Sequence, residues 1–330
     1  MEAKKPTLED VGRAAGVSRA TASRVITGAH RVSTNTRNRV WHAVEELGYH
    51  PDLAARALAK GRTDVIDLIV IDDDAATLVG SNPYYSRVVS GILSALAGTD
   101  TQMRTHVIDE PEARTRLDDV ARIVGVGALL VNVPPALAAR FSARCERVVS
   151  LGHSALGVPS IEAENAAGAR AAVEHLYRTG RRKVVAVHGK PNNSCADGRR
   201  HGFRVASVDA GHEPIGAEGG FCLEAGVEGT RELLAAHPDL DAIFAACDLT
   251  AMGVLRALNE SGRRVPEDVA LVGFDDSFLA SVATPAMTSV RQPVEHMAAM
   301  ATRALLANET GPNWQHIEPA PLQIRRSSAA

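Results

Sequence analysis

Residues 7–25 read TLEDVGRAAGVSRATASRV, and this stretch decides how the amino-terminal part of the chain folds. Thr7 is suited to cap a first helix, whose apolar residues then recur at helical spacing. Gly16 interrupts that pattern, and Ser18 is suited to cap a second helix that runs to about Ile26. The stretch therefore predicts two short helices joined by a tight turn.

A third helix is predicted to begin at Ser33 or Thr34 and to end at Gly48. Its apolar face is formed by Val40, Val44 and Leu47. Residues 1–50 are therefore predicted to form a small all-α unit. Residues 51–63 predict a short hinge helix, below the length that is stable alone in water, followed by a linker.

The second helix carries an outward face of small polar and basic side chains: Ser18, Arg19, Ala20, Thr21, Ser23 and Arg24. Hydroxyls and backbone amides at a helix amino terminus are natural ligands of phosphate groups. Arg19 and Arg24 are long enough to reach guanine edges in a DNA major groove. The pattern favours a helix-turn-helix that reads nucleic acid over the alternative, a solvated helical hairpin with ordinary surface arginines.

Charge is distributed unevenly along the 330 residues. The whole chain has a net charge of −3, but residues 1–62 hold eleven lysines and arginines against six acids. Their net charge of +5 leaves −8 for the remainder. A basic head on an acidic body fits a phosphate-binding module attached to a domain that does not bind DNA, although a short segment can also reach this charge by chance.

From residue 64 onward, short β-branched runs alternate with amphipathic stretches. The predicted strands are residues 65–71, 104–108, 128–131, 147–151, 183–187, 242–245 and 269–273. The predicted helices are residues 85–97, 112–124, 165–179, 197–210, 223–236, 249–261 and 293–306. This alternation predicts parallel sheets with helices on both faces. Because residues 64–330 are many for one such sheet, we expect two lobes with a ligand between them.

The cysteines are scattered and form neither a C-x-x-C pair nor a zinc-type cluster: Cys145, Cys195, Cys222 and Cys247. We expect free thiols in a reducing cytoplasm, no metal and no cofactor. The amino terminus lacks the apolar run of a secretory signal, and apolar runs such as residues 128–131 are far too short to span a bilayer. No membrane association is therefore expected.

The opening string resembles the signature of the LacI/GalR family of bacterial repressors, T-L-x-D-V-A-x-x-A-G-V-S-x-x-T-V-S-R-V-x-N. The motifs at residues 32–37, 47–51 and 55–58 keep the family's order and spacing. The resemblance implies base-edge contacts from Arg19, Ala20 and Arg24. It implies phosphate contacts from Ser18, Thr21, Ser23 and Thr36. Departures from the signature are mild and fall at Gly12, Ala22, residues 27–28 and Asp52.

Residues 53–59 match the hinge helix that folds only on the operator in this family. The resemblance implies minor-groove contacts from Ala55, Arg56 and Leu58. Leu58 matches an apolar side chain that is inserted as a wedge at the central base step. The insertion costs base-stacking energy and bends the duplex. Its alternative is a linker leucine resting on the body. Since one small head gives a modest interface, we expect a homodimer on a pseudo-palindromic, double-stranded operator.

The body resembles the type I periplasmic binding proteins, two Rossmann-like lobes joined by crossover strands, with landmarks at residues 82–85, 247–253 and 272–276. The resemblance implies that Arg199 and Asp275 hold the hydroxyls or carboxylates of an effector. Further implied pocket residues are Asn132, Phe221, Cys247 and Gln292. The alternatives are that Asp275 caps a helix, that Arg199 makes a surface ion pair and that Phe221 belongs to the core.

Two pocket positions depart from the sugar-binding members that the body resembles. Gly152 stands where they often carry Asp, and Cys247 stands where they often carry Asn. A site built to bond hydroxyls loses affinity when such partners are removed. The effector is then less hydroxylated than a simple hexose, or the pocket is degenerate. Candidates to compensate are His153, His188 and residues 72–74.

An enzyme and a secreted transport receptor are the alternative classes. The sequence holds no G-x-S-x-G, phosphate-loop or H-E-x-x-H motif. Asp275 and Asp276 are adjacent, so their side chains are expected to diverge rather than to form an acid/base pair. The sequence therefore predicts an all-α helix-turn-helix head and an α/β, two-lobed effector domain over residues 64–330. It predicts a non-enzymatic DNA-binding regulator, a repressor in the family's usual role, that responds to a sugar or related metabolite.

Overall fold

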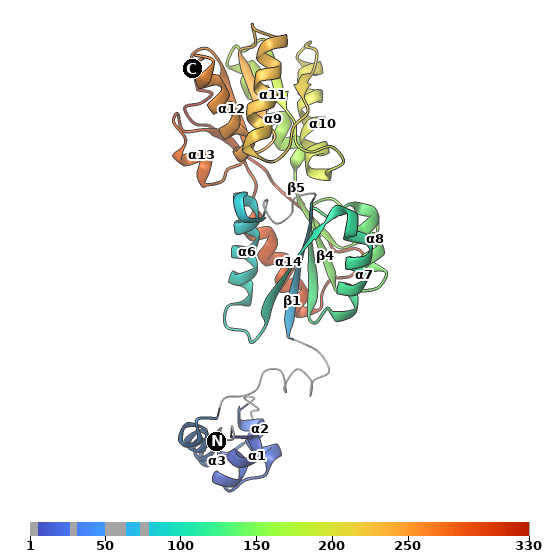
Figure 1. The fold of residues 1–330 in the computed structure, drawn as a ribbon, viewed down its shortest axis with the longest axis vertical. Coiled ribbons are helices and arrows are strands. Elements are labelled where there is room, and N and C mark those ends of the chain that lie inside the picture. The colour runs from blue at the N-terminus through green and yellow to red at the C-terminus, as the bar shows by residue number, and fades with distance from the viewer. Residues whose placement is uncertain (1–5, 27–31, 50–63, 73–78, 330) are drawn as a thin grey trace. The chain divides into compact units, whose positions relative to one another are not determined.

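The computed structural model describes residues 6–26, 32–49, 64–72 and 79–329. Contacts within the chain group it into two compact units, Met1–Thr63 and Asp64–Ala330. We call the first unit the head and the second unit the body. Figure 1 draws both as ribbons.

Three helices form the described part of the head: α1 (Leu8–Ala14), α2 (Arg19–Ile26) and α3 (Thr34–Leu47). Thr7 caps α1 in a capping box, in which its hydroxyl and the carboxylate of Asp10 each accept from the other residue's backbone N–H. Gly16 adopts φ +65° in the turn before α2, a conformation that favours glycine. The helices bury a small aliphatic core of Val11, Ala15, Ala22, Val25, Val40 and Ala43.

The predicted ends of the head helices agree with the structure. Ser18 and Ser33 cap α2 and α3, and Gly48 ends α3 in the left-handed conformation. The predicted apolar face of α3 is partly wrong. Leu47 is 37% exposed, because the core ends one turn earlier, where Ala43 is buried instead.

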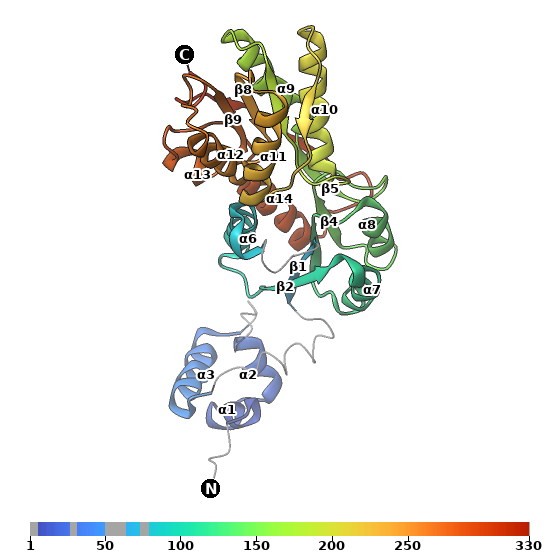
Figure 2. The same ribbon diagram turned by 45° about the horizontal axis from the view of Figure 1, so that its top comes forward.

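The body contains two six-stranded sheets, and each sheet defines a lobe (Figures 1 and 2). The first-lobe sheet has the order β11-β5-β4-β3-β1-β2, with β1 (Val65–Asp72), β2 (Gln102–Asp109), β3 (Gly127–Val131), β4 (Val148–Leu151), β5 (Ser160–Ala163) and β11 (Gln315–Glu318). The second-lobe sheet has the order β12-β10-β9-β8-β6-β7, with β6 (Val184–Val187), β7 (Ile215–Ala217), β8 (Ala242–Ala245), β9 (Ala270–Asp275), β10 (Thr288–Arg291) and β12 (Leu322–Gln323). Neighbouring strands are parallel, except that β10 and β12 are antiparallel.

Helices cover both faces of each sheet, as the alternating sequence pattern predicts. The first lobe has α6 (Pro83–Leu96), the short 3-10 helix η1 (Glu110–Glu112), α7 (Ala113–Ile123), α8 (Pro135–Ser142) and α14 (Val294–Ala307). The second lobe has α9 (Asn165–Arg178), α10 (Ser194–Asp209), α11 (Leu223–Ala236), α12 (Asp248–Glu260) and α13 (Phe278–Val282). On β1, Ile66 and Leu68 pack toward α6 and α14, whereas Ile69 and Ile71 pack toward α7 and α8. Burial on both faces explains why this strand reads as a continuous apolar run.

The sequence pattern missed the shortest elements, namely β5, β7, β10, β11, β12, α8 and α13. Most of them are strands of two to four residues, and they lack the largely apolar runs by which the four-residue strands β4, β6 and β8 were predicted. Several of the missed strands adjoin the segments where the chain crosses between lobes. These crossovers lie between β5 and α9, between β10 and α14, and between β11 and β12.

Among the residues that the structure describes, no helix combines the length and the apolar composition needed to cross a bilayer.

A close helix crossing fixes α10 against α9. A Cβ atom placed on Gly202 of α10 would lie 2.1 Å from the carbonyl oxygen of Ala166, which belongs to α9. Because that neighbour is backbone, it cannot rotate away. Gly202 therefore sets the distance between the two helices.

Replacing Gly202 with Ala is expected to lower the free energy of unfolding of the body by about 1–3 kcal/mol, because the two helix backbones must separate. Urea denaturation of the full chain, followed by circular dichroism, measures the change. Gly311→Ala is the matched control, since a Cβ at Gly311 meets open space. If both variants unfold at the same urea concentration, the crossing is not tight.

His188 follows β6 and is buried against Phe203, with the two rings edge to face and their centroids 5.5 Å apart. Burial, together with the nearby charge of Arg200, lowers the pKa of His188 to about 4. In the unfolded chain a histidine titrates near pH 6.5. The unfolded state therefore binds a proton more readily than the folded state in the interval between these two values.

Stability is accordingly expected to fall as the pH is lowered from about 6.5 to about 4, by at most about 3 kcal/mol from this residue. His188→Gln should flatten that part of the pH profile, as measured by thermal unfolding at a series of pH values. The control His201→Gln removes an exposed histidine of α10 and should retain the wild-type slope. A profile for His188→Gln that is as steep as that of the wild type would contradict the assignment.

Candidate functional sites: an exposed head helix and an interlobe cavity

The outward face of α2 carries the three predicted base-reading residues. Arg19, Ala20 and Arg24 are all exposed, while Ala22 and Val25 on the opposite side are buried in the head core. The two arginines lie five residues apart on the same helix. The structure thus presents α2 as a solvent-facing element held by the other two helices.

The predicted phosphate-contacting residues gather at helix amino termini. The Ser18 hydroxyl accepts from the backbone N–H of Thr21 at 3.1 Å and lies 2.9 Å from the Thr21 hydroxyl. The same arrangement recurs at α3, where the Ser33 hydroxyl lies 2.9 Å from that of Thr36. Ser23 lies further along α2 and is half-buried. Unpaired N–H groups and the helix dipole make both termini favourable places for an anion.

The predicted hinge residues Ala55, Arg56 and Leu58 lie outside the described residues. The same is true of Asp52 and of residues 27–28, where the sequence departs from the family signature.

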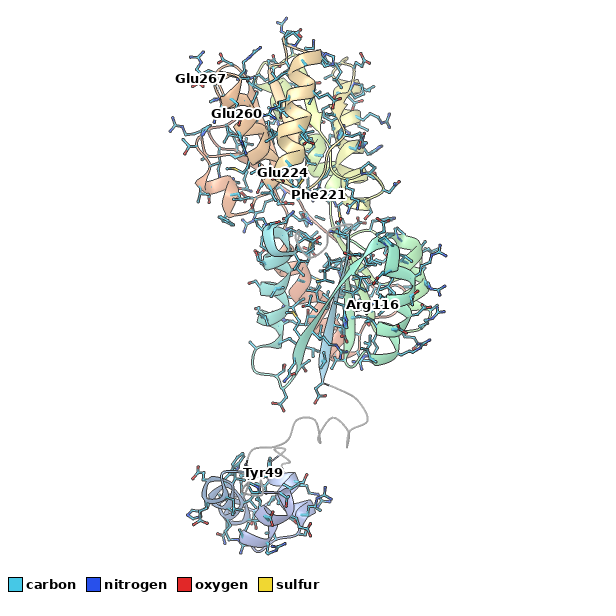
Figure 3. All side chains as sticks on the ribbon, in the orientation of Figure 1. Tyr49, Arg116, Phe221, Glu224, Glu260 and Glu267 are labelled. Atoms are coloured by element: carbon cyan, nitrogen blue, oxygen red, sulfur yellow. The ribbon has the colours of Figure 1, made fainter. Side chains whose placement is uncertain are left out.

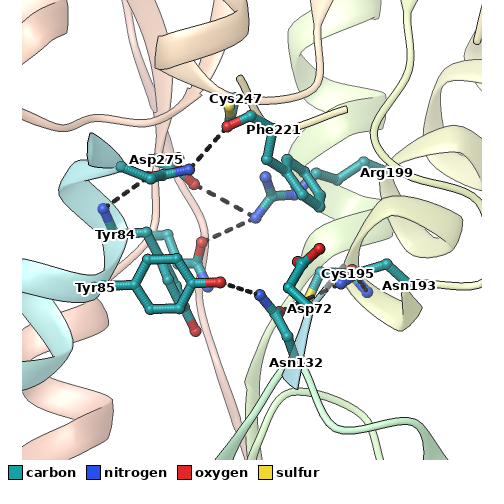
Figure 4. A pocket seen from close by; sticks show the side chains of 12 residues that line it. Asp72, Tyr84, Tyr85, Asn132, Asn193, Cys195, Arg199, Phe221, Cys247 and Asp275 are labelled. Atoms are coloured by element: carbon teal, nitrogen blue, oxygen red, sulfur yellow. Dashed lines mark hydrogen bonds and ion pairs between the residues drawn. The ribbon is translucent and has the colours of Figure 1, made fainter. Parts of the chain in front are cut away.

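A cavity of about 470 Å³ lies between the two lobes of the body (Figure 4). All six predicted effector residues line it: Asn132, Arg199, Phe221, Cys247, Asp275 and Gln292. Its other lining residues are Asp72, Asn82, Tyr84, Tyr85, Asn193 and Cys195. Many of the twelve stand at or just after the carboxyl end of a strand, which is where ligands bind in open α/β sheets.

Arg199 of α10 is 4% exposed, and its guanidinium donates to three neutral acceptors. Its Nε donates to Asn165 Oδ1 at 2.9 Å, its Nη1 to the carbonyl of Ala246 at 2.6 Å, and its Nη2 to Gln292 Oε1 at 2.9 Å. The guanidinium also stacks on Phe274, 3.7 Å from the ring centroid. The alternative of a surface ion pair is therefore wrong, because a buried arginine holds the two crossover residues Asn165 and Gln292.

Asp275 ends β9 with its carboxylate beside the cavity, 3.5 Å from Arg199 Nη2. Burial raises the pKa of Asp275, and the charge of Arg199 opposes that rise. Its backbone has φ +109°, which costs on the order of 1–3 kcal/mol and is typical of functional sites. Asp276 turns away and pairs with Arg325 at 2.6 Å, so the predicted divergence of the two carboxylates is confirmed.

Arg87 of α6 bonds the backbone at the carboxyl ends of β9 and β10, and the sequence analysis missed it. It donates to the carbonyl oxygens of Asp275 and Gln292, each at 2.8 Å, and forms a two-point ion pair with Glu295 at 2.7 and 2.8 Å. An arginine in an amphipathic helix gives no sequence signal of this role. The ion pair lowers the pKa of Glu295 against the opposing effect of burial.

Cys247 stands at the start of α12, where its Sγ accepts from the backbone N–H of Thr250 at 3.4 Å. The next residue, Asp248, is buried and accepts from Ser277 N at 2.6 Å and from Ser289 Oγ at 2.6 Å. Burial, with a contribution from the nearby Asp275, raises the pKa of Asp248. These bonds hold the loop after β9 in place beneath the cavity.

Aromatic and amide groups complete the wall that faces Arg199 (Figure 4). Asn132 Nδ2 donates to the Tyr85 hydroxyl at 2.6 Å, and the rings of Tyr84 and Tyr85 meet edge to face. Phe221 is half-buried on the side of the second lobe that faces the first (Figure 3), so it is not a core residue. Its carbonyl accepts from Asn82 Nδ2 at 3.0 Å, which joins the lobes.

The sequence analysis did not single out several of these residues, namely Asn82, Tyr84, Tyr85, Asn193 and Cys195. Two features of the sequence could have pointed to the tyrosines. Aromatic residues make up only 4% of the chain, and Tyr84 and Tyr85 stand together directly after the Asn-Pro pair at residues 82–83. Of the candidates to compensate for Gly152 and Cys247, Asp72 lines the cavity, whereas His153 and His188 do not. Residues 73 and 74 lie outside the described residues.

The described side chains include no cluster of three or more His, Cys, Asp or Glu residues that is placed to hold a metal ion.

Comparisons with known proteins assign both units. Residues 7–52 match the model of bacterial regulatory proteins of the lacI family, and residues 173–328 match the model of the periplasmic binding protein-like domain. The HTH-type transcriptional regulator CelR of Thermobifida fusca is 38% identical over 93% of each chain. The ribose operon repressor of Halalkalibacterium halodurans is 29% identical over 97% of this chain and 93% of its own.

Solved structures agree with these matches. A complex of the transcriptional regulator CelR with cellobiose has a TM-score of 0.74 at 34% identity and covers 98% of this chain and 99% of its own. The Lac repressor dimer bound to operator and the anti-inducer ONPF has a TM-score of 0.86 at 26% identity, covering 99% of this chain and 100% of its own. The chain therefore belongs to the LacI family of bacterial regulatory proteins, and it is a DNA-binding transcriptional regulator controlled by a small-molecule effector.

Proposed function

We propose that the protein represses transcription from a pseudo-palindromic operator as a homodimer, and that a sugar bound in the interlobe cavity controls this binding. The observation that carries the proposal is the meeting of Arg199, Asp275 and Gln292 at one cavity, next to the crossovers that join the lobes. A ligand at this place touches both lobes at once.

On DNA, α2 enters the major groove, and Arg19, Ala20 and Arg24 face the base edges. The exposure of these residues and the rigid core behind them support this orientation. Ser18, Thr21, Ser23 and Thr36 contact phosphates near helix amino termini. Ala55, Arg56 and the wedge Leu58 act in the minor groove, a role that rests on the sequence resemblance alone.

Dimer formation is proposed to use the body, with α13 as one contact. Phe278 and Val282 are 64% and 65% exposed, and they lie four residues apart on one face of this helix. Apolar side chains exposed together on a helix mark an interaction surface more often than chance. A second copy is the fitting occupant, since a solved relative at 26% identity is a dimer on its operator.

A sugar fits the chemistry of the cavity. Tyr84 and Phe221 offer aromatic faces, while Asp275 and Arg199 offer charged groups for hydroxyls. The hydrogen-bonding capacity that Gly152 and Cys247 lack is supplied by Asp72, Asn132 and Asn193, all of which line the cavity. The CelR relative is solved with cellobiose, and two of the similar repressors are named for the ribose operon.

Effector control requires that the ligand bind one arrangement of the lobes more tightly than another. Arg199 bonds the crossover residues Asn165 and Gln292 and also faces Asp275 in the cavity. A ligand that bonds to Asp275 or to the guanidinium of Arg199 changes the hydrogen bonds from Arg199 to the crossover residues. The lobes then settle at a different relative angle, and that change reaches the linker through β1.

No catalytic step is proposed for the cavity, and we place the protein in the cytoplasm, where its operator is. The side chains of Asp275 and Asp276 diverge, so this adjacent carboxylate pair does not form an acid/base couple. The similar proteins are transcriptional regulators. Unchanged sugar after prolonged incubation with the purified protein is the expected result of a turnover assay.

Arg24→Ala is expected to lower operator affinity by about 1–3 kcal/mol and to relax the preference at one or two base pairs, because a bidentate contact to guanine is lost. Selection from a randomised duplex library, followed by affinity measurements at one fixed salt concentration, tests both effects. Arg39→Ala is the control, since it removes the same charge from the exposed side of α3. Arg39→Ala should leave the ratio of operator affinity to random-DNA affinity unchanged. If Arg24→Ala also leaves this ratio unchanged, Arg24 contacts only phosphate.

Asp275→Asn is expected to weaken sugar binding by roughly 10- to 100-fold, because a charged acceptor for ligand hydroxyls becomes a neutral amide. Isothermal titration with a panel of mono- and disaccharides measures the loss, after a thermal-shift screen has found the binders. The matched control is Asp276→Asn, whose carboxylate pairs with Arg325 instead. Equal losses in the two variants would exclude a direct role for Asp275.

A further inference from the structure

The carboxyl group of Asp248 is buried without a cationic partner. Asp248 is the first residue of α12 and is 1% exposed. Its Oδ2 accepts from the backbone N–H of Ser277 at 2.6 Å and from Ser277 Oγ at 2.8 Å, and its Oδ1 accepts from Ser289 Oγ at 2.6 Å. All three donors are neutral, and no described lysine, arginine or histidine forms an ion pair with Asp248. Because a buried charge without a cation is costly, the neutral acid is favoured at this position.

A second buried carboxyl group lies close to the first. Asp275 is 6% exposed and stands two residues beyond Gly273 on β9. A Cβ atom on Gly273 would lie 2.6 Å from Asp248 Oδ1, so this strand runs directly past the carboxyl group of Asp248. Burial, together with the charge of Asp275, raises the pKa of Asp248 to about 7. Since two neighbouring buried carboxyl groups resist ionising together, one of them is expected to keep a proton near neutral pH.

The arginines near the pair decide which carboxyl group keeps the proton. Burial raises the pKa of Asp275 as well, but the charges of Arg199 and Arg87 oppose that rise. Arg199 Nη2 lies 3.5 Å from the Asp275 carboxylate, whereas Asp248 has hydrogen bonds from neutral groups only. The proton therefore belongs on Asp248, and the negative charge belongs on Asp275.

The other groups around Asp248 do not supply it with a cation. The titratable and charged side chains of the strands, helices and loops packed beside it are Cys247, Asp275, Asp276, Arg87, Arg199 and Arg325. Each of the three arginines is bonded to groups other than Asp248. The thiol of Cys247 stays neutral, because burial raises its pKa to about 12. Asp248 is thus held by hydrogen bonds alone.

A proton on Asp248 is compatible with the bonds that hold the loop after β9. The acid has one O–H to donate, and Ser277 Oγ can accept it when its own hydrogen turns away. The N–H of Ser277 and the hydroxyl of Ser289 still donate to the carboxyl oxygens, and Ser289 Oγ still accepts from the backbone N–H of Asp276 at 3.0 Å. This support matters because Asp275 and Asp276 have φ +109° and +49°, which are strained conformations.

We propose that Asp248 is a positioning residue for effector binding, which holds a proton at neutral pH and thereby keeps Asp275 charged and in place beside the cavity. Asp248 is not among the residues that line the cavity, so it acts through Asp275. Loss of the proton at higher pH sets two buried anions against each other beside a strained backbone. Effector binding is then accompanied by proton uptake and weakens as the pH rises above neutrality. The inference rests on the role of Asp275 in the function proposed above.

The proton on Asp248 can be tested without an effector, by urea unfolding of the full chain at a series of pH values. An aspartate of the unfolded chain titrates at about pH 3.9, so the folded chain alone keeps this proton between that value and its raised pKa. The urea midpoint of the wild type, relative to that of Asp248→Asn, is therefore expected to fall as the pH rises from about 4 to about 7 and then to level off. The contribution of His188 is common to both proteins and cancels.

Glu224→Gln is the matched control for the unfolding experiment. It neutralises an exposed acid in the first turn of the neighbouring helix α11, and its midpoint should keep a constant offset from the wild type. A constant offset for Asp248→Asn as well would overturn the proposal.

Isothermal titration with cellobiose and with ribose tests the link to binding. Above about pH 7 the wild-type affinity is expected to fall by at most about tenfold per pH unit, the limit for one linked proton. Titrations in buffers of different ionisation enthalpy count that proton as uptake on binding, a measurement that needs only the wild type. Asp248→Asn, which mimics the neutral acid, should match the wild type at about pH 6 and keep its affinity at about pH 9.

The binding outcomes separate this inference from the function on which it rests. Equal loss of affinity in Asp248→Asn at both pH values would make the carboxylate a fixed structural acceptor, and no proton uptake by the wild type would exclude the linkage; either result overturns the proposal while sugar control stands. If neither sugar binds, sugar control falls, and the urea experiment alone decides whether Asp248 holds the proton.

Discussion

The buried guanidinium of Arg199 is the constraint on which the body depends. A charge at 4% exposure is tolerated only when it is hydrogen-bonded or paired, and here the guanidinium donates to Asn165, Gln292 and the carbonyl of Ala246 and lies 3.5 Å from the carboxylate of Asp275. The first two of these residues sit where the chain passes from one lobe to the other. The guanidinium that lines the cavity is therefore also bonded to residues at two of the crossovers between the lobes.

Arg87 complements this arrangement from the first lobe. It holds the backbone of Asp275 and Gln292, while Arg199 approaches the same two residues through their side chains. The two arginines thus contact the same two positions, at the carboxyl ends of the neighbouring strands β9 and β10. Arg87 also pairs with Glu295 of α14, so it links α6 and α14 of the first lobe to the backbone of Asp275 and Gln292.

The sequence predicted the parts of the fold that rest on local chemistry. Thr7, Ser18 and Gly16 specify the head through caps and a turn, and the longer strands and helices of the body follow from their apolar periods. Strands of two to four residues, such as β12, have no readable period and depend on the finished sheet. In the site, family resemblance brought forward Arg199 and Asp275. Arg87 escaped notice because its contacts across the lobes leave no trace in the local sequence pattern, whereas the Tyr84-Tyr85 pair was visible in the sequence and was not singled out.

Cys247 belongs both to the wall of the cavity and to the start of α12. Its sulfur lines the cavity and at the same time accepts from the backbone N–H of Thr250 in the first turn of α12, a task for which a thiol sulfur is a weak acceptor compared with oxygen. Any substitution of Cys247 therefore changes the cavity wall and the cap of α12 at the same time. A substitution at this position that changes which ligands fit the cavity must therefore also provide a cap for α12.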